Sequence, residues 1–191
     1  MTSLRAFRPQ DLFHMNLTNL DPLTENYNID FYMHYLINWP SLFTVAEDQD
    51  GNIIGYMMGK LEEDPFYRQF SPHYLPHHGH ITALTISPQS RRLGLAQHLT
   101  AALEHACDAA NAWFVDLFVR AGNKSAVNLY KGMGYSVFRV VVDYYSDDPT
   151  GGGAGEDAFD MRKPLKRDKK REHVRENGED FKVEPEDLWH G

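Results

Sequence analysis

The sequence predicts an α/β fold in which a mixed central β-sheet is flanked by helices. Short segments rich in β-branched residues, such as 80–87, alternate with helix-like segments, such as 94–111. The expected order is strand, helix, helix, three strands, helix, strand, helix, strand, with an optional last strand, and this order is typical of a mixed sheet. The chain has 191 residues, 42% of them hydrophobic, which suffices for one domain with its own core.

The first third of the chain predicts one strand and two helices. Residues 3–7 alternate as in a strand, and residues 9–17 have apolar positions at helical spacing after Pro9. Residues 21–28 are rich in turn-forming residues and predict a loop. A second helix is expected over residues 30–39, with Asp30 as its N-cap and Pro40 as its stop.

The middle of the chain predicts a hairpin, a long loop, a strand and a helix. The turn DQDGN, residues 48–52, joins two strands. A loop with several prolines precedes the strand at 80–87, and the alanine-rich helix 94–111 follows it. Cys107 lies inside that helix beside alanine, which indicates a small buried residue and not a nucleophile.

The remaining elements form a second strand–helix–strand series. A strand is expected at 113–120, a helix at 123–133 capped by Asn123, and a long strand at 135–145. Gly134 should end the helix. A glycine-rich loop, TGGGAGEDA, leads to a possible short final strand at 159–165.

Composition predicts where the folded domain ends and which partners it excludes. We expect the domain to span residues 1–163, and residues 164–191 to be a charged tail, disordered or a loosely attached helix. The KRDKKR run within it predicts a solvated linker or a docking segment for a partner. The net charge of −8 argues against nucleic-acid binding. One cysteine, no signal-peptide layout and no long apolar run predict a cytoplasmic protein away from membranes.

The segment SRRLGLA, residues 90–96, carries the strongest chemical signal. Helix N-termini offer free N–H groups and a partial positive charge, so they bind phosphate. Gly94 lets the backbone approach a ligand, Ala96 is small, and Arg91 and Arg92 add charged donors. The pattern predicts a pyrophosphate cradle, and the alternative is a helix start with an exposed arginine pair.

The arrangement Arg91-x-x-Gly94-x-Ala96 resembles the R/Q-x-x-G-x-G/A motif of the GNAT acetyltransferases. The later segment VDLFVRAGNKSAVNLYKGMGY resembles a second motif of that family, in which an asparagine opens a helix and a tyrosine lies near its end. Segments such as NLDPLTENY, FYMHYL and DYYS further resemble the NatB-type N-terminal acetyltransferases of the family. The resemblance implies acetyl transfer from acetyl-CoA to the α-amine of nascent chains that begin with Met followed by Asp, Glu, Asn or Gln. It also implies a large helical auxiliary subunit and attachment to ribosomes. The expected location is the cytoplasm.

The resemblance also assigns roles to residues. Tyr130 would protonate the leaving thiolate, and His80, at the start of its strand, could relay a proton through water. With Tyr144 these two are the catalytic candidates. The cofactor-binding candidates are Leu84, Thr85, Ile86, Arg91, Arg92, Leu93, Gly94, Leu95, Ala96, Asn123 and Tyr130.

The peptide would enter a mouth lined from two parts of the chain. Its candidates are Glu25 and Tyr27 in the first loop, His80 and Thr82 on one face of their strand, and Tyr144 and Tyr145 on the far side. In a regular strand the two tyrosines would point to opposite faces. The histidine-rich stretch at residues 73–80 lacks Cys and carboxylate partners at ligand spacing, so no metal is expected.

Two other functions remain open from the sequence. The chain could be a GNAT enzyme for another amine, such as other N-termini, lysine or a small molecule. It could also be a non-catalytic acyl-CoA-binding module that retains the fold. The apolar helices near residues 12–17 and 31–39 are expected to form a surface for a partner.

Overall fold

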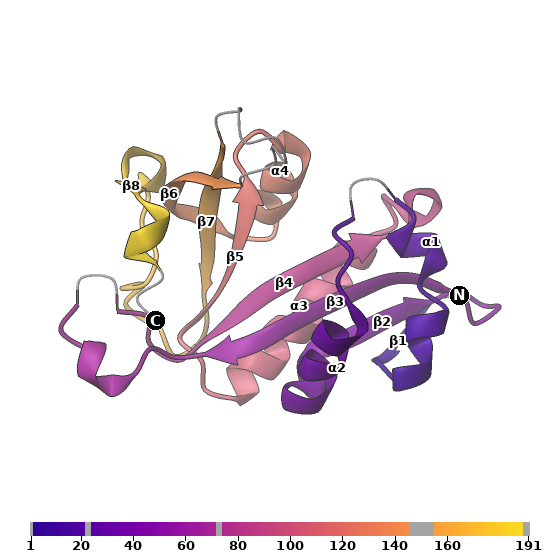
Figure 1. Ribbon diagram of the computed structural model, residues 1–191. Coiled ribbons are helices and arrows are strands. Elements are labelled where there is room, and N and C mark those ends of the chain that lie inside the picture. The colour runs from indigo at the N-terminus through magenta and orange to yellow at the C-terminus, as the bar shows by residue number, and fades with distance from the viewer. Residues whose placement is uncertain (1, 22–23, 72–73, 146–154, 189–191) are drawn as a thin grey trace. The chain divides into compact units, whose positions relative to one another are not determined.

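The computed structural model describes residues 2–21, 24–71, 74–145 and 155–188. The strands and helices follow the expected order (Figure 1). The chain forms two compact units, each described here by itself. The first unit comprises Met1–Leu61 and Gly79–Ala110, and the second comprises Glu62–His78 and Asn111–Gly191. Short 3₁₀ helices lie at Pro9–Phe13, Pro40–Leu42, Phe66–Arg68, Pro88–Ser90, Gly178–Asp180 and Pro185–Asp187.

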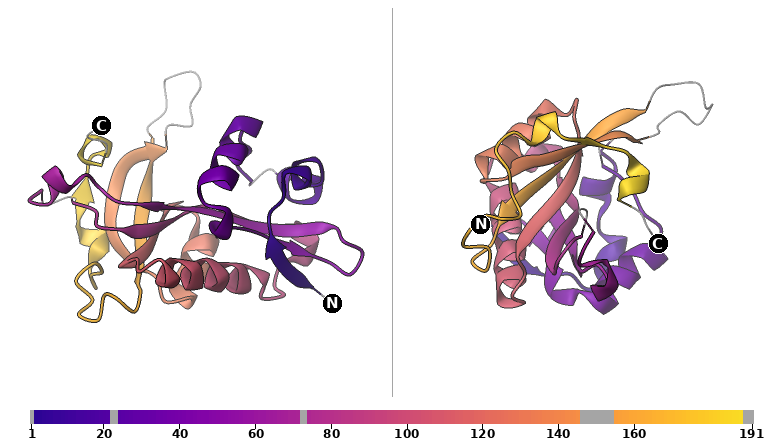
Figure 2. Two further views of the ribbon diagram at one scale, coloured as in Figure 1. Left: turned by 90° about the horizontal axis from the view of Figure 1, so that it is seen from below. Right: turned by 90° about the vertical axis from the view of Figure 1, so that its left-hand side faces the viewer.

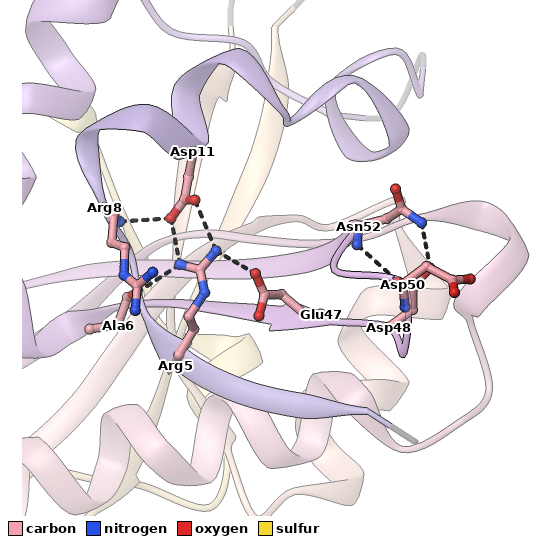
Figure 3. Close-up of polar contacts among 8 residues, drawn as sticks. All are labelled: Arg5, Ala6, Arg8, Asp11, Glu47, Asp48, Asp50 and Asn52. Atoms are coloured by element: carbon pink, nitrogen blue, oxygen red, sulfur yellow. Dashed lines mark hydrogen bonds and ion pairs between the residues drawn. The ribbon is translucent and has the colours of Figure 1, made fainter.

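The first unit is built on four neighbouring strands in chain order: β1 (Ser3–Ala6), β2 (Phe43–Glu47), β3 (Ile53–Glu62) and β4 (His78–Ile86). The β1–β2 and β2–β3 pairs are antiparallel. The predicted hairpin turn is confirmed, because the Asp48 carboxylate accepts the amides of Asp50 and Asn52, each at 2.9 Å (Figure 3). Gly51 completes the turn with a φ of +80°, which favours glycine.

Helices cover both faces of this part of the sheet. The helices α1 (Asn16–Asn19) and α2 (Ile29–Asn38) lie on one face and α3 (Leu95–Ala109) on the other (Figure 2). The core on the α2 side is aromatic, with Tyr32, Tyr35, Phe43 and Tyr56 all buried. Cys107 is fully buried in α3 and is not part of a disulfide, and its burial agrees with its surroundings in the sequence.

Two glycines of β3 make room for neighbouring side chains, Gly55 for one of β4 and Gly59 for one of α3. A Cβ on Gly55 would lie 2.6 Å from Cδ1 of Ile86, and one on Gly59 would lie 2.5 Å from Cδ1 of Leu103. Real Cβ atoms do not come so near to other atoms, so this packing requires glycine, which has no side chain, at both positions.

Two local expectations for the first unit were wrong. The helix expected over residues 9–17 is divided into the 3₁₀ helix Pro9–Phe13 and α1, because Asp11 accepts the backbone amide of Arg8 at 2.7 Å and both Nη atoms of Arg5 (Figure 3). This pins the first turn to β1 before a regular helix can extend. The cap of α2 is Asn28, which accepts the amide of Phe31 at 2.8 Å, and not Asp30, which lies in the first turn.

The second unit carries the other four strands in the order β5-β7-β6-β8. They are β5 (Phe114–Arg120), β6 (Ser136–Tyr145), β7 (Glu156–Pro164) and β8 (Lys182–Val183). The β5–β7 and β6–β7 pairs are antiparallel and β6–β8 is parallel, so this part of the sheet is mixed. The helix α4 (Lys124–Gly132) connects β5 to β6. The possible short last strand is therefore a nine-residue strand between β5 and β6.

A buried charge cluster holds β6 and β7 together. The carboxylate of Asp160 accepts hydrogen bonds from Nε of Arg139 at 2.8 Å and from Nη2 of Arg162 at 2.9 Å. Burial lowers the pKa of Arg139, and the nearby Asp160 offsets part of that effect. The Arg162 guanidinium also covers the Phe138 ring at 3.6 Å.

The C-terminal segment differs from the expected disordered tail. Asp168 is buried and accepts the amides of Glu172 and His173 at 2.9 and 3.0 Å. The guanidinium of Arg175 lies 4.0 Å from the Phe138 ring centroid and 4.1 Å from that of Phe181. Arginine stems and rings replace the aliphatic residues whose absence suggested disorder. The glycine-rich loop falls mainly outside the described residues. Within those residues, no helix has the length and apolar character needed to cross a membrane.

Candidate active site

The start of α3 has no side-chain cap. Gly94 is the N-cap residue, with a φ of +76°, and it has no side chain with which to cap the first amides of the helix. Those amides carry the partial positive end of the helix dipole. Arg92 also has a positive φ of 65°, and Leu93 is exposed. Among the described residues, the first amides of α3 thus receive no side-chain cap, and the pyrophosphate cradle expected at SRRLGLA stays a prediction.

Arg91 lies beside this helix start and is held in place from two directions. Its Nε donates to the carbonyl of Ile86 at 3.2 Å, and its Nη2 forms an ion pair with the carboxylate of Asp21. The Asp21 side chain is 5% exposed and the Arg91 side chain is 43% exposed. The guanidinium is thus fixed on one side and open to solvent on the other.

Strand β4 brings a stripe of half-buried side chains to one face. His80, Thr82 and Leu84 alternate along it, and Thr85 and Ile86 are buried at its end. The strand begins at His78, so His80 is its third residue and not its first, as the sequence suggested. Thr82 Oγ1 is hydrogen-bonded to the Tyr35 hydroxyl of α2 at 2.8 Å.

The loop before α2 places the two predicted peptide-binding residues together. The Tyr27 hydroxyl donates to Glu25 Oε2 at 3.1 Å, and its ring stacks on Phe31 with 4.4 Å between centroids. Burial, with Glu25 nearby, raises the pKa of Tyr27 well above its usual value. The phenol therefore stays neutral and acts as a hydrogen-bond donor.

In the second unit, α4 carries the predicted thiolate acid. Asn123 caps this helix as expected, accepting the amide of Ala126 at 3.1 Å. Tyr130 lies near its end, 8% exposed, edge-on to Tyr135. Burial raises the pKa of Tyr130 above its usual value, and Tyr145 adds to the effect.

The two tyrosines at the end of β6 do not follow the strand alternation. Tyr144 stacks on Phe118 at 4.9 Å, and the Arg120 guanidinium lies 4.1 Å from the Tyr145 ring centroid. Phe118 and Arg120 are two residues apart on β5 and share one face. The expectation of opposite faces was therefore wrong, because β6 is irregular between Val141 and Tyr145, where Asp143 has a φ of 50°.

Three residues that support these side chains were not predicted from the sequence: Asp21, Glu156 and Arg120. Asp21 holds Arg91, and Glu156 pairs with Arg120 at 3.1 Å while accepting the amide of Gly122 at 3.0 Å. Each contact joins positions far apart in the chain, so no local pattern signals it. Asp21 was visible only as a turn-forming residue.

His77 and His78 of the histidine-rich stretch belong to the second unit, and His80 belongs to the first. His78 is buried, stacks on Phe114 at 4.8 Å and contacts the carbonyl of Pro76 through Nδ1 at 2.7 Å. His73 lies outside the described residues. Across the residues that are described, no group of three or more His, Cys, Asp or Glu could hold a metal ion.

Comparison with known proteins agrees with this geometry. The model of the acetyltransferase (GNAT) family matches residues 10–135. The N-terminal acetyltransferase B complex catalytic subunit naa20 of Schizosaccharomyces pombe is 50% identical over 98% of this chain and 99% of that protein. The corresponding subunit NAT3 of Saccharomyces cerevisiae is 41% identical over 98% and 99%.

Solved structures give the same result for the fold. Chaetomium thermophilum Naa20 in complex with a bisubstrate analogue is 59% identical, with a TM-score of 0.92 over 98% of this chain and 100% of that one. A NatB acetyltransferase complex bound to a bisubstrate inhibitor is 42% identical, with a TM-score of 0.79 over 98% and 99%. The chain therefore belongs to the GNAT family of acetyltransferases, in its branch of NatB-type N-terminal acetyltransferases.

Proposed function

We propose that this protein transfers the acetyl group of acetyl-CoA to the α-amine of protein chains that begin with Met followed by Asp, Glu, Asn or Gln. The observation that carries the proposal is the uncapped start of α3 at Gly94, with Arg91 fixed beside it. Amides and a guanidinium at one helix start suit the pyrophosphate of the donor. The solved relatives bound to bisubstrate compounds support both halves of the reaction.

The reaction requires no covalent enzyme intermediate. The acceptor amine has a pKa of about 8, so a substantial fraction is already neutral near pH 7. Its nitrogen attacks the thioester carbonyl, the C–N bond forms, and the C–S bond then breaks. Tyr130 donates its phenolic proton to the leaving thiolate, and the attacking amine releases its proton through water to His80. The raised pKa of Tyr130 keeps the phenol protonated until that step.

The peptide would be held by its backbone, and candidate residues for this role lie in both units. Glu25 and Tyr27 are joined by a hydrogen bond in the first unit, and Tyr144 and Tyr145 contact one another in the second. Thr82, on the face of β4 that also carries His80, would contact the first residues of the peptide. Tyr144 remains a candidate for the proton transfers, and Asn123 and Leu84 for contact with the cofactor.

An auxiliary subunit would cover exposed apolar residues near α1 and α2. Phe13, Leu20 and Ile37 are 76%, 80% and 71% exposed. Contiguous exposed apolar surface of this kind is typical of protein–protein contacts, and the proposal requires these side chains to share one surface. We propose a helical auxiliary subunit on this surface, as expected from the apolar helices in the sequence. The assembly of the two subunits would acetylate nascent chains at cytoplasmic ribosomes.

A transfer assay tests the proposed substrate class. Labelled acetyl-CoA would be offered with peptides that start Met-Asp, Met-Glu, Met-Asn, Met-Leu or Ser-Glu, and with a blocked peptide that contains an internal lysine. The auxiliary subunit would be present throughout. Strong preference for the first three peptides is expected, since each combines a first methionine with a polar second side chain.

Two results would contradict the proposal. Preferred transfer to Met-Leu or to the internal lysine would make the protein a GNAT enzyme for another acceptor. Failure to bind acetyl-CoA, with or without the auxiliary subunit, would favour a non-catalytic module.

A further inference from the structure

We propose that Asp21 is a positioning residue that fixes Arg91 for the donor pyrophosphate and couples acetyl-CoA binding to peptide binding. The proposal rests on the function proposed above. Asp21 and Arg91 form an ion pair within the first unit although they lie far apart in the chain.

The guanidinium of Arg91 is oriented by two contacts. Arginine has five N–H donors in a rigid fork, and its side chain loses much rotamer freedom when it binds an anion. Asp21 and the carbonyl of Ile86 use two of the five donors and fix the orientation of Arg91 in advance. The remaining donors can bind a second anion without further ordering of the side chain.

The carboxylate of Asp21 is buried. The Asp21 side chain is 5% exposed, and burial of a carboxylate is costly unless a partner compensates for the lost solvation. Arg91 provides that partner although its own side chain is 43% exposed and does not need the pair in order to be solvated. The contact therefore matters more to the conformation of the loop at Asp21 than to the solvation of Arg91.

The backbone of Asp21 contacts the segment that carries the peptide-binding residues. The carbonyl of Asp21 accepts the amide of Thr24 at 2.9 Å, and the next residue is Glu25, which holds Tyr27. Asp21 thus pairs with Arg91 through its side chain and holds Thr24, the neighbour of Glu25, through its carbonyl. A donor that stabilises the Arg91 conformation also stabilises Asp21 and its contact with Thr24, and by linkage the effect is reciprocal.

The test varies both substrates in kinetics of the complex with its auxiliary subunit. Asp21→Asn keeps the shape of the side chain and removes its charge. We expect the KM for acetyl-CoA to rise about tenfold and the KM for a Met-Asp peptide about threefold, with little change in kcat. Asp50→Asn, the same change at an exposed hairpin position of the same unit, should alter neither constant.

A double-mutant cycle separates this inference from the proposed function. In an Arg91→Gln background, Asp21→Asn should have no further effect on either KM. Arg91→Gln alone should raise the peptide KM as well, and this readout holds even if Asp21→Asn does not fold. If Arg91→Gln leaves the acetyl-CoA KM unchanged, the assigned role of Arg91 is wrong.

Other results overturn only the coupling. If Arg91→Gln raises the acetyl-CoA KM but Asp21→Asn does not, Asp21 does not position the arginine. Tighter acetyl-CoA binding in Asp21→Asn would show that the carboxylate competes with the pyrophosphate. Additive effects in the double variant would show that the two residues act independently.

Discussion

Tyr130 shows how the surroundings of one residue define its chemistry. Its phenol is buried at the end of α4, and burial raises its pKa above the usual value. Because the charged form of tyrosine is the deprotonated one, a raised pKa preserves the proton donor to higher pH. The acceptor amine must instead be deprotonated, since its nitrogen attacks the thioester only after it has lost its proton.

Tyr130→Phe removes the proton donor while retaining the ring. We expect kcat to fall about 100-fold, the usual size of a general-acid contribution, with the KM for acetyl-CoA nearly unchanged. In the unmodified protein, kcat/KM for the peptide should rise as pH passes about 8 and remain level to about pH 9.5.

A pH profile together with the variant tests this assignment. A loss of rate between pH 8.5 and 9.5 that disappears in Tyr130→Phe would contradict the raised pKa. Tyr135→Phe is a matched control on the neighbouring ring, and it should retain nearly all activity.

Single residues also show what a local pattern can and cannot predict. Asn123 was predicted as a cap because Asn before an apolar helical run has one simple role, and the structure confirms it. The same reasoning chose Asp30 over Asn28 for α2, because both can cap a helix and the pattern does not distinguish them. Asp21 was missed as a partner of Arg91 because the contact depends on the tertiary fold.

At the scale of an element, close packing of α3 on β3 depends on Gly59. A Cβ there would lie 2.5 Å from Leu103 Cδ1 and 2.7 Å from the carbonyl oxygen of His80. We expect Gly59→Ala to lower the free energy of unfolding by about 1–3 kcal/mol, measured in denaturant. The contact with the His80 carbonyl is rigid backbone, so it cannot relax as a side chain would.

Gly132, the last residue of α4, is the control for this substitution. A Cβ there would meet no atom within 4 Å. Gly132→Ala should be neutral or should stabilise the protein by up to about 1 kcal/mol, because alanine favours the helix. Equal losses in the two variants would contradict the packing argument.

Regular elements were predicted well and irregular ones were not. Periodicity located β4, α3, β5 and α4 to within two residues, because their buried faces repeat at the helical or strand spacing. The irregularity in β6 near Asp143 was missed, because a non-glycine residue with positive φ leaves no sequence signal. The prediction for Tyr144 and Tyr145 failed for that reason.

At the scale of the whole molecule, the sequence underestimated how much of the chain is ordered. The comparison with Chaetomium thermophilum Naa20 covers 98% of the chain, and the C-terminal segment contributes β8 and several buried residues. Composition predicted disorder because aliphatic residues are scarce after residue 165. The stabilising contacts are between arginine and aromatic rings, which composition alone does not reveal.

Arg175→Ala tests whether those contacts stabilise the protein. Its guanidinium faces two rings, Phe138 and Phe181, so we expect the free energy of unfolding to fall by about 1–2 kcal/mol. Lys169→Ala, a substitution at an exposed position of the same segment, should change it by less than about 0.5 kcal/mol. Equal stability of the two variants, measured in guanidinium chloride, would mean that the ring contacts contribute nothing.

The parallel pairing of β8 with β6 has a consequence for solubility. Val140 and Val141 of β6 face Lys182 and Val183, so the two-residue β8 occupies the hydrogen-bonding side of a long, apolar strand. A strand left open on that side is a template on which a second molecule can add its own strand. The charged end of the chain therefore acts as a guard against self-association, and shortened chains that lack it should aggregate at concentrations where the full chain remains monodisperse.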